Sequence, residues 1–125
     1  MTRRVLVADD EPYIRLLILQ TLEELEDDGV EFSSAVNGQQ ALELIKVEHP
    51  RLVFLDVMMP FMSGFDVCRA VKREPDFADV YVVLLTAKGQ EIDRQKGAEV
   101  GADLYMTKPF DPDELLERAR QVLGL

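Results

Sequence analysis

Apolar runs alternate with amphipathic segments along the whole chain. Five short runs rich in β-branched and other apolar residues predict strands at Arg4–Ala8, Val30–Ala35, Leu52–Asp56, Val80–Leu85 and Leu104–Thr107. Three of them contain the nearly continuous apolar stretches VLVA, LVFLD and VYVVLL. Such stretches are typical of parallel strands that are buried on both faces.

Between the strands, apolar residues recur at helical spacing. The first helix follows Pro12 and carries one apolar face, formed by Ile14, Leu17, Ile18, Thr21, Leu22 and Leu25. Four more helices are predicted from about Gln39 to Glu48, over Ser63–Glu74, from Glu91 to Val100, and from Asp113 to Leu123 after Pro112. A proline is favoured in the first turn of a helix. The fourth of these five helices is weakly patterned and contains Gly97.

The order of these elements predicts the fold class. Five strands that alternate with five helices indicate an α/β protein with a parallel sheet covered by helices on both faces. The chain has no internal repeat and no linker-like stretch. We therefore expect one domain over residues 1–125, which ends with its last helix.

Composition and charge exclude several classes of function. The 125 residues include 24 acids and 14 bases, for a formal net charge of −10, so polyanionic nucleic acid is repelled and direct DNA binding is not expected. No apolar run approaches the ~20 residues that span a bilayer. The opening MTRR leads straight into a strand and leaves no room for a secretory signal. With Cys68 as the only cysteine, we expect a cytoplasmic protein without an internal disulfide.

The metal chemistry open to the chain is similarly limited. One histidine, His49, and one cysteine cannot build a zinc site. Any metal must therefore be a hard cation held by oxygen ligands.

Polar residues gather where the predicted strands end. Asp9 and Asp10 follow the first strand, Asp56 ends the third, Thr86 the fourth, and Lys108 the fifth. In an open parallel sheet, ligands bind beyond the carboxyl ends of the strands. We therefore expect these side chains to share one cleft.

This set predicts a magnesium site that supports phosphoryl transfer. Converging carboxylates repel one another, and Lys108 alone cannot neutralise them, so a divalent cation is expected. Asp10 and Asp56 are candidate direct ligands, and Asp9 binds directly or through a metal-bound water. An aspartate shielded by a cation can attack phosphorus as a nucleophile, and the Thr86 hydroxyl could then bond a phosphoryl oxygen on Asp56.

Four stretches together resemble the receiver domain of two-component response regulators: VLVADDEP, LVFLDVMMPFMSGFDV, VVLLTA and GADLYMTKPF. The resemblance covers essentially the whole chain, with the motifs in order and correctly spaced. It implies a flavodoxin-like, doubly wound fold with five parallel strands in the order 2-1-3-4-5.

The resemblance also implies a role for each residue of the set. Asp56 matches the aspartate that accepts a phosphoryl group from a phosphohistidine. Asp9 and Asp10 match the pocket for Mg²⁺, for which Mn²⁺ can substitute, and the backbone carbonyl of Met58 completes the protein ligands. Lys108 matches the phosphate-binding lysine of the family, and Thr86 matches the switch hydroxyl. Tyr105 matches the switch aromatic, and the Lys108–Pro109 bond matches a peptide bond that is often cis in the family.

A physical coupling between these parts is expected. A phosphoryl group adds up to two negative charges and new acceptor oxygens. If Thr86 moves to bond one of them, Tyr105 can turn inward to fill the vacated space. Because the fourth helix is poorly packed and contains a glycine, it should be easy to rearrange. The switching face is therefore predicted around Lys88–Val100, Leu104–Met106 and the fifth helix, while the side chains of Met58 and Lys88 flank the reaction path.

The same resemblance implies partners. The phosphodonor is a sensor histidine kinase or a histidine phosphotransfer protein, and the switch controls an output domain or an effector protein. The sequence leaves open whether the chain forms a phosphorylation-dependent homodimer. Asp103, Arg118 and Arg120 match charged residues through which members of the family pair, but Leu104 stands where a second acid is common. Leu16 and Leu19 point away from the apolar face of the first helix and are either partner contacts or single exposed leucines.

Three rival functions can be weighed from the residues. An aspartate-dependent phosphohydrolase requires a D-x-D motif after the first strand, and Asp9-Asp10-Glu11 does not fit it. A nucleotide or flavin binder lacks a glycine-rich phosphate loop here. A pseudo-receiver, which is never phosphorylated, typically lacks the aspartate or the lysine that this chain has at Asp56 and Lys108. We therefore expect a signalling switch, not an enzyme in the ordinary sense, that assists only its own phosphorylation and dephosphorylation.

Overall fold

The structure is a computed structural model that describes residues 3–87 and 91–125. Its centre is a parallel sheet of five strands in the order β2-β1-β3-β4-β5. The strands are β1 (Arg3–Ala8), β2 (Val30–Ala35), β3 (Leu52–Asp56), β4 (Tyr81–Ala87) and β5 (Leu104–Lys108). The strand order predicted from the family resemblance is therefore confirmed.

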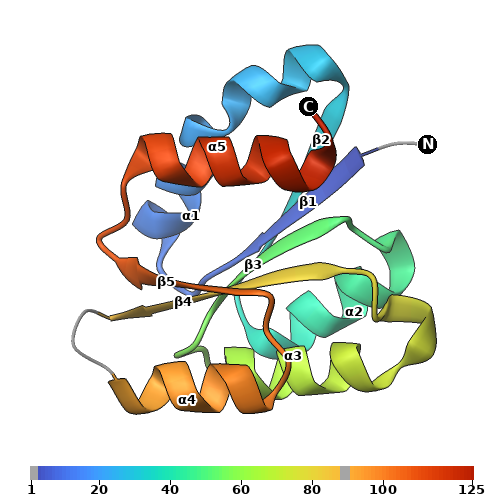
Figure 1. Ribbon diagram of the computed structural model, residues 1–125, viewed down its shortest axis with the longest axis vertical. Helices are drawn as coiled ribbons and strands as arrows, with labels where there is room; N and C mark the ends of the chain where they lie inside the picture. Colours follow the sequence, from blue (N-terminus) through green and yellow to red (C-terminus); the bar gives the residue numbers. More distant parts are fainter. Residues whose placement is uncertain (1–2, 88–90) are drawn as a thin grey trace.

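Helices cover both faces of the sheet (Figure 1). On one face lie α1 (Pro12–Thr21) and α5 (Pro112–Leu123). On the other lie α2 (Gly38–Glu48), α3 (Gly64–Arg73) and α4 (Glu91–Glu99). Two short 3-10 helices, η1 (Glu23–Asp28) and η2 (Pro75–Phe77), complete the described elements.

The two layers enclose two hydrophobic cores, because successive strand residues point to opposite faces of a sheet. Leu6, Val53 and Leu84 face α2 and α3, where they pack with Ile45 and Val67. The alternate strand residues pack under α1 and α5 with Ile18, Leu22, Leu115 and Leu123. The central strands are thus buried on both sides, as their continuous apolar character predicts.

Side-chain caps set the starts of three helices. Asn37 accepts a hydrogen bond from the Gln40 amide at the start of α2, and Ser63 accepts one from Asp66 at the start of α3. At the start of α5, Asp111 accepts from Asp113, and Pro112 occupies the first turn. Such caps satisfy amide groups that have no partner inside the helix.

The first helix is shorter than its apolar pattern predicts. Helix α1 ends at Thr21, and the segment that contains Leu25 forms η1. This segment, EELEDD, carries five acids. Negative charge is unfavourable at the carboxyl end of a helix, which explains the early end of α1. Leu22 and Leu25 are nevertheless fully buried, so the predicted apolar face is kept.

Two residues differ from their sequence interpretation. Leu19 is partly buried and packs against the core under α1 and α5, whereas Leu16 is 55% exposed. Gly97 is closely packed: a β-carbon there would lie 3.2 Å from Cδ1 of Leu84 and 3.3 Å from Cδ2 of Tyr105. Gly97 therefore has a packing role, because a glycine at this position lets α4 approach the sheet. It also has a weak helix propensity, as the sequence indicates.

No helix in the described ranges has the length and apolar character needed to cross a bilayer. Lys88, which belongs to the predicted switching face and flanks the predicted reaction path, lies outside the described residues.

Candidate functional site

The carboxyl ends of three strands of the sheet bring the candidate side chains together. Asp9 follows β1, Asp56 is the last residue of β3, and Lys108 is the last residue of β5. These strand ends lie on the left side of the sheet in Figure 1. The convergence that the sequence predicts for these three residues is therefore present.

Lys108 is the cation at the centre of this group. Its Nζ lies 3.1 Å from Oδ2 of Asp9, 3.2 Å from Oδ1 of Asp56 and 3.8 Å from Oε1 of Glu11. The lysine side chain is 16% exposed, so most of its length is packed against protein. A single ammonium thus forms ion pairs with three carboxylates at once.

The carboxylates form a compact cluster of four, Asp9, Asp10, Glu11 and Asp56, with one oxygen of each within 4.8 Å of the others. Asp9 and Asp56 are buried, whereas Asp10 and Glu11 are exposed. Four carboxylates and one ammonium leave an excess of negative charge, and an all-oxygen donor set suits Mg²⁺. The residues therefore fit the predicted cation.

Glu11 is not among the ligands that the sequence predicts. Its position as the third of three consecutive acids is the signal that could have included it. Backbone geometry explains its place, because the Glu11 amide donates to Oδ1 of Asp9 at 2.9 Å and so turns the chain back toward the cluster.

Two further hydrogen bonds hold the acids in place. Arg15 of α1 donates from Nη1 to the backbone carbonyl of Asp9 at 2.7 Å. The Met58 amide donates to Oδ1 of Asp56 at 3.3 Å. The backbone of Met58 thus lies beside the candidate phospho-acceptor, and the role of its carbonyl as a metal ligand stays a prediction.

The protonation of Asp56 reflects this environment. Burial, together with the negative charge of Asp9, raises the pKa of Asp56 from 3.8 to about 7, although Lys108 opposes the rise. Burial by itself would lower the pKa of Lys108, but the neighbouring Asp56 and Asp9 reverse this and raise the pKa of the ammonium. Lys108 therefore stays charged at neutral pH, whereas Asp56 is poised to lose its proton when more positive charge arrives.

The loop from Val57 to Ser63, which joins β3 to α3, is held close to Asp56 by two glycines. A β-carbon on Gly64 would lie 2.4 Å from the backbone oxygen of Asp56. A β-carbon on Gly38 would lie 1.8 Å from the backbone oxygen of Met62. The backbone therefore approaches too closely at both points for any other residue without a shift.

Thr86 and Tyr105 lie on neighbouring strands. Thr86 is buried and pairs in register with Thr107, and Leu84 pairs with Tyr105. Tyr105 packs against the core that faces α2 and α3, and strand alternation places Thr86 on the same face of the sheet as Leu84. The Lys108–Pro109 peptide bond is cis, as the resemblance predicts.

The charged residues considered for a homodimer have partners within the chain. Asp103 forms an ion pair with Lys72 at 2.7 Å, and Arg120 pairs with Glu24.

The single histidine and the single cysteine lie away from the acidic cluster. His49 caps the carboxyl end of α2 and bonds Asp79 at 3.0 Å. Cys68 is buried in the core.

Comparison with known proteins identifies the same family over most of the chain. Residues 5–120 match the family model described as the response regulator receiver domain. The regulatory protein PhoB of Pseudomonas aeruginosa, named for the phosphate regulon, is 43% identical over 121 residues, which are 97% of this chain and 52% of PhoB. The ycf27 protein of Cyanophora paradoxa is 42% identical over 121 residues, 97% of this chain and 48% of ycf27. The chain thus spans about half the length of these curated relatives.

Solved structures give the same result. The chemotaxis protein CheY4 of Vibrio cholerae is 32% identical, with a TM-score of 0.84 over 98% of this chain and 100% of CheY4. The receiver domain of the Francisella response regulator 1452 is 30% identical, with a TM-score of 0.84 over 98% of both chains.

Proposed function

The chain belongs to the response regulator receiver domain family, whose members are signalling switches of two-component systems, and we propose that Asp56 is its phospho-acceptor. One observation carries the proposal most directly: Lys108 contacts both Asp9 and Asp56 within a cluster of four carboxylates. We infer that phosphorylation of Asp56 depends on Mg²⁺ and changes the surface formed by α4, β5 and α5.

The chemistry is a single phosphoryl transfer. A carboxylate oxygen of Asp56 attacks the phosphorus of a phosphohistidine on the donor protein. As the new O–P bond forms, the P–N bond breaks, and the imidazole nitrogen leaves with the bonding electron pair. The product is an aspartyl phosphate on this chain and a free histidine on the donor.

Lys108 supports this transfer electrostatically. Its ammonium lies 3.2 Å from Oδ1 of Asp56, so it can pair with an oxygen of the incoming phosphoryl group without a large movement. The transferring group carries negative charge into a pocket that already has an excess of carboxylates, and one ammonium cannot offset that charge.

Asp9, Asp10 and Asp56, with the Met58 carbonyl, would hold the magnesium ion, and Glu11 is close enough to contribute. Bound there, a divalent cation would offset the negative charge of the phosphoryl group and of the acids around it. The bond from Arg15 would hold the backbone of Asp9, and the bond from the Met58 amide would orient the carboxylate of Asp56.

The switch would begin with Thr86. A phosphoryl oxygen on Asp56 offers a new acceptor to the Thr86 hydroxyl, and movement of Thr86 toward it would open space on its face of the sheet. Tyr105 is half-buried on the same face, one strand away, and could turn into that space. Because the Tyr105 ring lies close to Gly97, its rotation would alter the packing of α4.

The partners follow from this chemistry. The donor would be a sensor histidine kinase or a histidine phosphotransfer protein. The changed surface would act on an output domain or an effector protein, or would pair two copies of the chain. PhoB is named as a transcriptional regulatory protein, and this chain matches about half of it, which supports an output domain as the target.

A phosphodonor assay tests the proposal. Incubated with radiolabelled acetyl phosphate and Mg²⁺, the wild-type chain should acquire acid-stable, base-labile label, and Asp56→Asn should acquire essentially none. Asp76→Asn, an exposed acid on η2, is the matched control and should be labelled normally. An unlabelled wild-type chain would support a pseudo-receiver, and turnover of p-nitrophenyl phosphate would support a phosphohydrolase.

A further inference from the structure

The loop from Val57 to Ser63 keeps its residues near the candidate phospho-acceptor. Val57 directly follows Asp56, and Gly64 returns against the backbone oxygen of Asp56. Consecutive Cα atoms are about 3.8 Å apart, so Phe61, three residues before Gly64, lies within about 15 Å of that oxygen. Phe61 therefore belongs to a loop whose two ends lie beside the candidate phospho-acceptor.

Phe61 occupies an unfavourable backbone conformation. Its φ is +69°, and the amide of Met62 bonds the carbonyl of Pro60 at 2.8 Å across it. A three-residue turn with positive φ at its centre is rare and strained, and a bulky side chain makes it more so. Glycine would suit this position better, yet the chain has phenylalanine.

No described contact inside the protein accounts for this choice. The Phe61 side chain is 85% exposed, whereas Met59 and Met62 of the same loop pack against the core. Met58 is 76% exposed. The loop thus turns two methionines inward for its own packing and leaves a methionine and a phenylalanine facing out.

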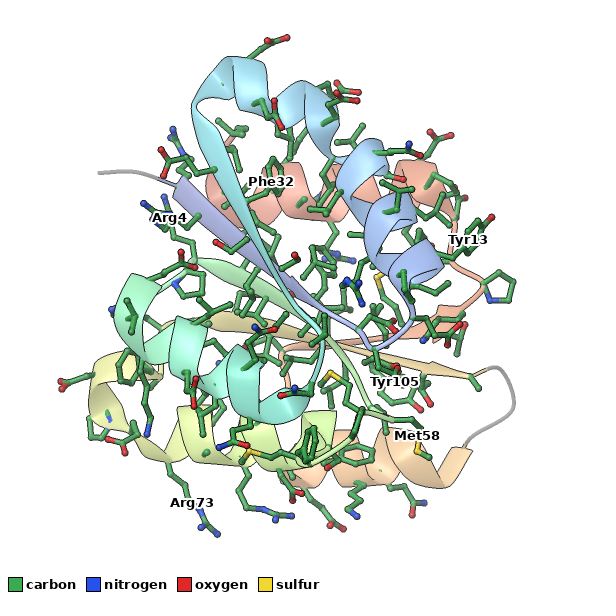
Figure 2. All side chains as sticks on the ribbon, turned by 180° about the vertical axis from the view of Figure 1, so that it is seen from behind. Arg4, Tyr13, Phe32, Met58, Arg73 and Tyr105 are labelled. Atoms are coloured by element: carbon green, nitrogen blue, oxygen red, sulfur yellow. The ribbon has the colours of Figure 1, made fainter. Side chains whose placement is uncertain are left out.

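A second exposed aromatic ring lies at the same end of the molecule as the loop. Tyr13, at the start of α1, is 72% exposed, and Figure 2 shows it at the same end of the molecule as Met58, opposite Arg4. Any protein that delivers a phosphoryl group to the buried Asp56 must bring its histidine to this end of the sheet. Its surface will then cover the loop.

We propose that Phe61 is a specificity-determining contact, which inserts into an apolar depression beside the phosphohistidine of the donor protein. This inference rests on the proposed function and assigns one recognition element to it. Burial of an exposed aromatic ring at the centre of an interface is a large source of binding energy. A strained conformation that presents such a ring is typical of sites where the strain serves function.

Two phosphodonors of different size test the proposal. One is acetyl phosphate, which has no protein surface that could bury the Phe61 ring. The other is the phosphorylated core of a histidine kinase chosen because it phosphorylates the wild-type chain. For Phe61→Gly we expect kcat/KM with the kinase to fall at least tenfold, mainly through KM, and the rate with acetyl phosphate to stay within twofold of wild type.

Conservative and remote variants complete the experiment. Phe61→Tyr should recover most of the kinase reaction, because it keeps the ring. Val47→Ala, which removes another exposed apolar side chain (82% exposed, on α2), should leave both reactions unchanged. Glycine relieves the backbone strain at position 61, so the urea unfolding midpoint of Phe61→Gly should not lie below that of wild type. A normal midpoint would show that a slower kinase reaction comes from the lost contact and not from partial unfolding.

The outcomes are distinguishable from those of the proposed function. If Phe61→Gly reacts with the kinase at the same kcat/KM as the wild-type chain, the proposed contact is wrong. An equal loss with both donors would also overturn it, because the loop would then act on Asp56 itself. Unchanged labelling of Asp56→Asn by either donor would instead overturn the phospho-acceptor assignment.

Discussion

The ammonium of Lys108 lies 3.2 Å from a carboxylate oxygen of Asp56, and this contact joins the end of the last strand to the end of the central one. The acceptor is thus held by the same charge that would meet the incoming phosphoryl group. The lysine also contacts Asp9, so it is shared between acids and leaves each of them incompletely neutralised. The predictions below follow from this shared charge and from the packing around it.

The first prediction concerns stability and pH. The pKa of Asp56 is raised from 3.8 to about 7, chiefly by burial. Between these pH values the native protein keeps a proton that the unfolded chain releases, so the free energy of unfolding falls as the pH rises. Without divalent cations, Asp56→Asn should therefore match wild type near pH 4 and be more stable at pH 8, by up to about 4 kcal/mol.

Urea unfolding in EDTA, followed by circular dichroism from pH 4 to 8, measures this difference. The exposed Asp76→Asn variant serves as a control and should show no such trend. Addition of Mg²⁺ should narrow the gap at pH 8, because the cation binds and stabilises the native wild-type chain. A gap that is independent of pH would contradict the prediction.

The second prediction concerns the competition between Lys108 and a divalent cation for the same carboxylates. In Lys108→Met the ammonium is lost and the four acids remain, so Mg²⁺ should bind more tightly, by about 1 kcal/mol or roughly fivefold. Isothermal titration calorimetry can measure the affinity. Lys46→Met, on the exposed surface of α2, is the matched control. Weaker binding in Lys108→Met than in the control would show that the lysine organises the acids and does not compete with the cation.

The third prediction concerns the close approach at Gly64. A β-carbon there would lie 2.4 Å from the Asp56 backbone oxygen, so Gly64→Ala must displace β3 or α3. We expect a loss of about 2 to 3 kcal/mol in the free energy of unfolding, together with slower labelling of Asp56.

Gly29→Ala is the comparison variant for this change, measured by the same unfolding and labelling assays. Gly29 has φ +83° and no atom within 4 Å of an added β-carbon, so its alanine variant suffers backbone strain alone. It should lose about 1 kcal/mol and be labelled normally. Equal stability of Gly64→Ala and wild type would show that the close approach can relax freely.

The fourth prediction concerns the buried thiol of Cys68. Burial raises its pKa from 9.0 to about 11, and the thiol lies 3.6 Å from the Val100 carbonyl that accepts its hydrogen bond. Because the thiolate is the reactive form, the shift alone reduces reactivity about a hundredfold at pH 8. Reaction with a disulfide reagent should therefore be at least that much slower in the native protein than in urea. Comparable rates in the two states would contradict the burial.

Much of the architecture was readable from the sequence, because most of its features depend on residues near one another in the chain or on general properties of parallel sheets. Nearly continuous apolar runs indicated buried parallel strands, and helical spacing with Pro12 and Pro112 indicated two helix starts. The strand order and the cis Lys108–Pro109 bond came from the family resemblance, and both are confirmed. The convergence of Asp9, Asp56 and Lys108 followed from a general property of parallel sheets, whose carboxyl ends share one edge.

Other features depended on distances between segments, which no local pattern contains. Glu11 joins the acidic cluster because its amide bonds Asp9, and Leu19 is partly buried because α5 packs beside α1. Gly97 looked like a weak point in a helix, but Leu84 and Tyr105 approach it so closely that a β-carbon there would have to displace their side chains.

The sequence by itself thus determined the elements, their order along the chain and the chemical types of the site residues. Periodicity, turn residues and charge are local properties, and the edge at which parallel strands end is a general one. Only the tertiary structure decided which acids share Lys108, which glycines are closely packed and how Phe61 faces the solvent. Those outcomes depend on contacts of a few ångströms between elements, and such contacts arise only when the two layers close on the sheet.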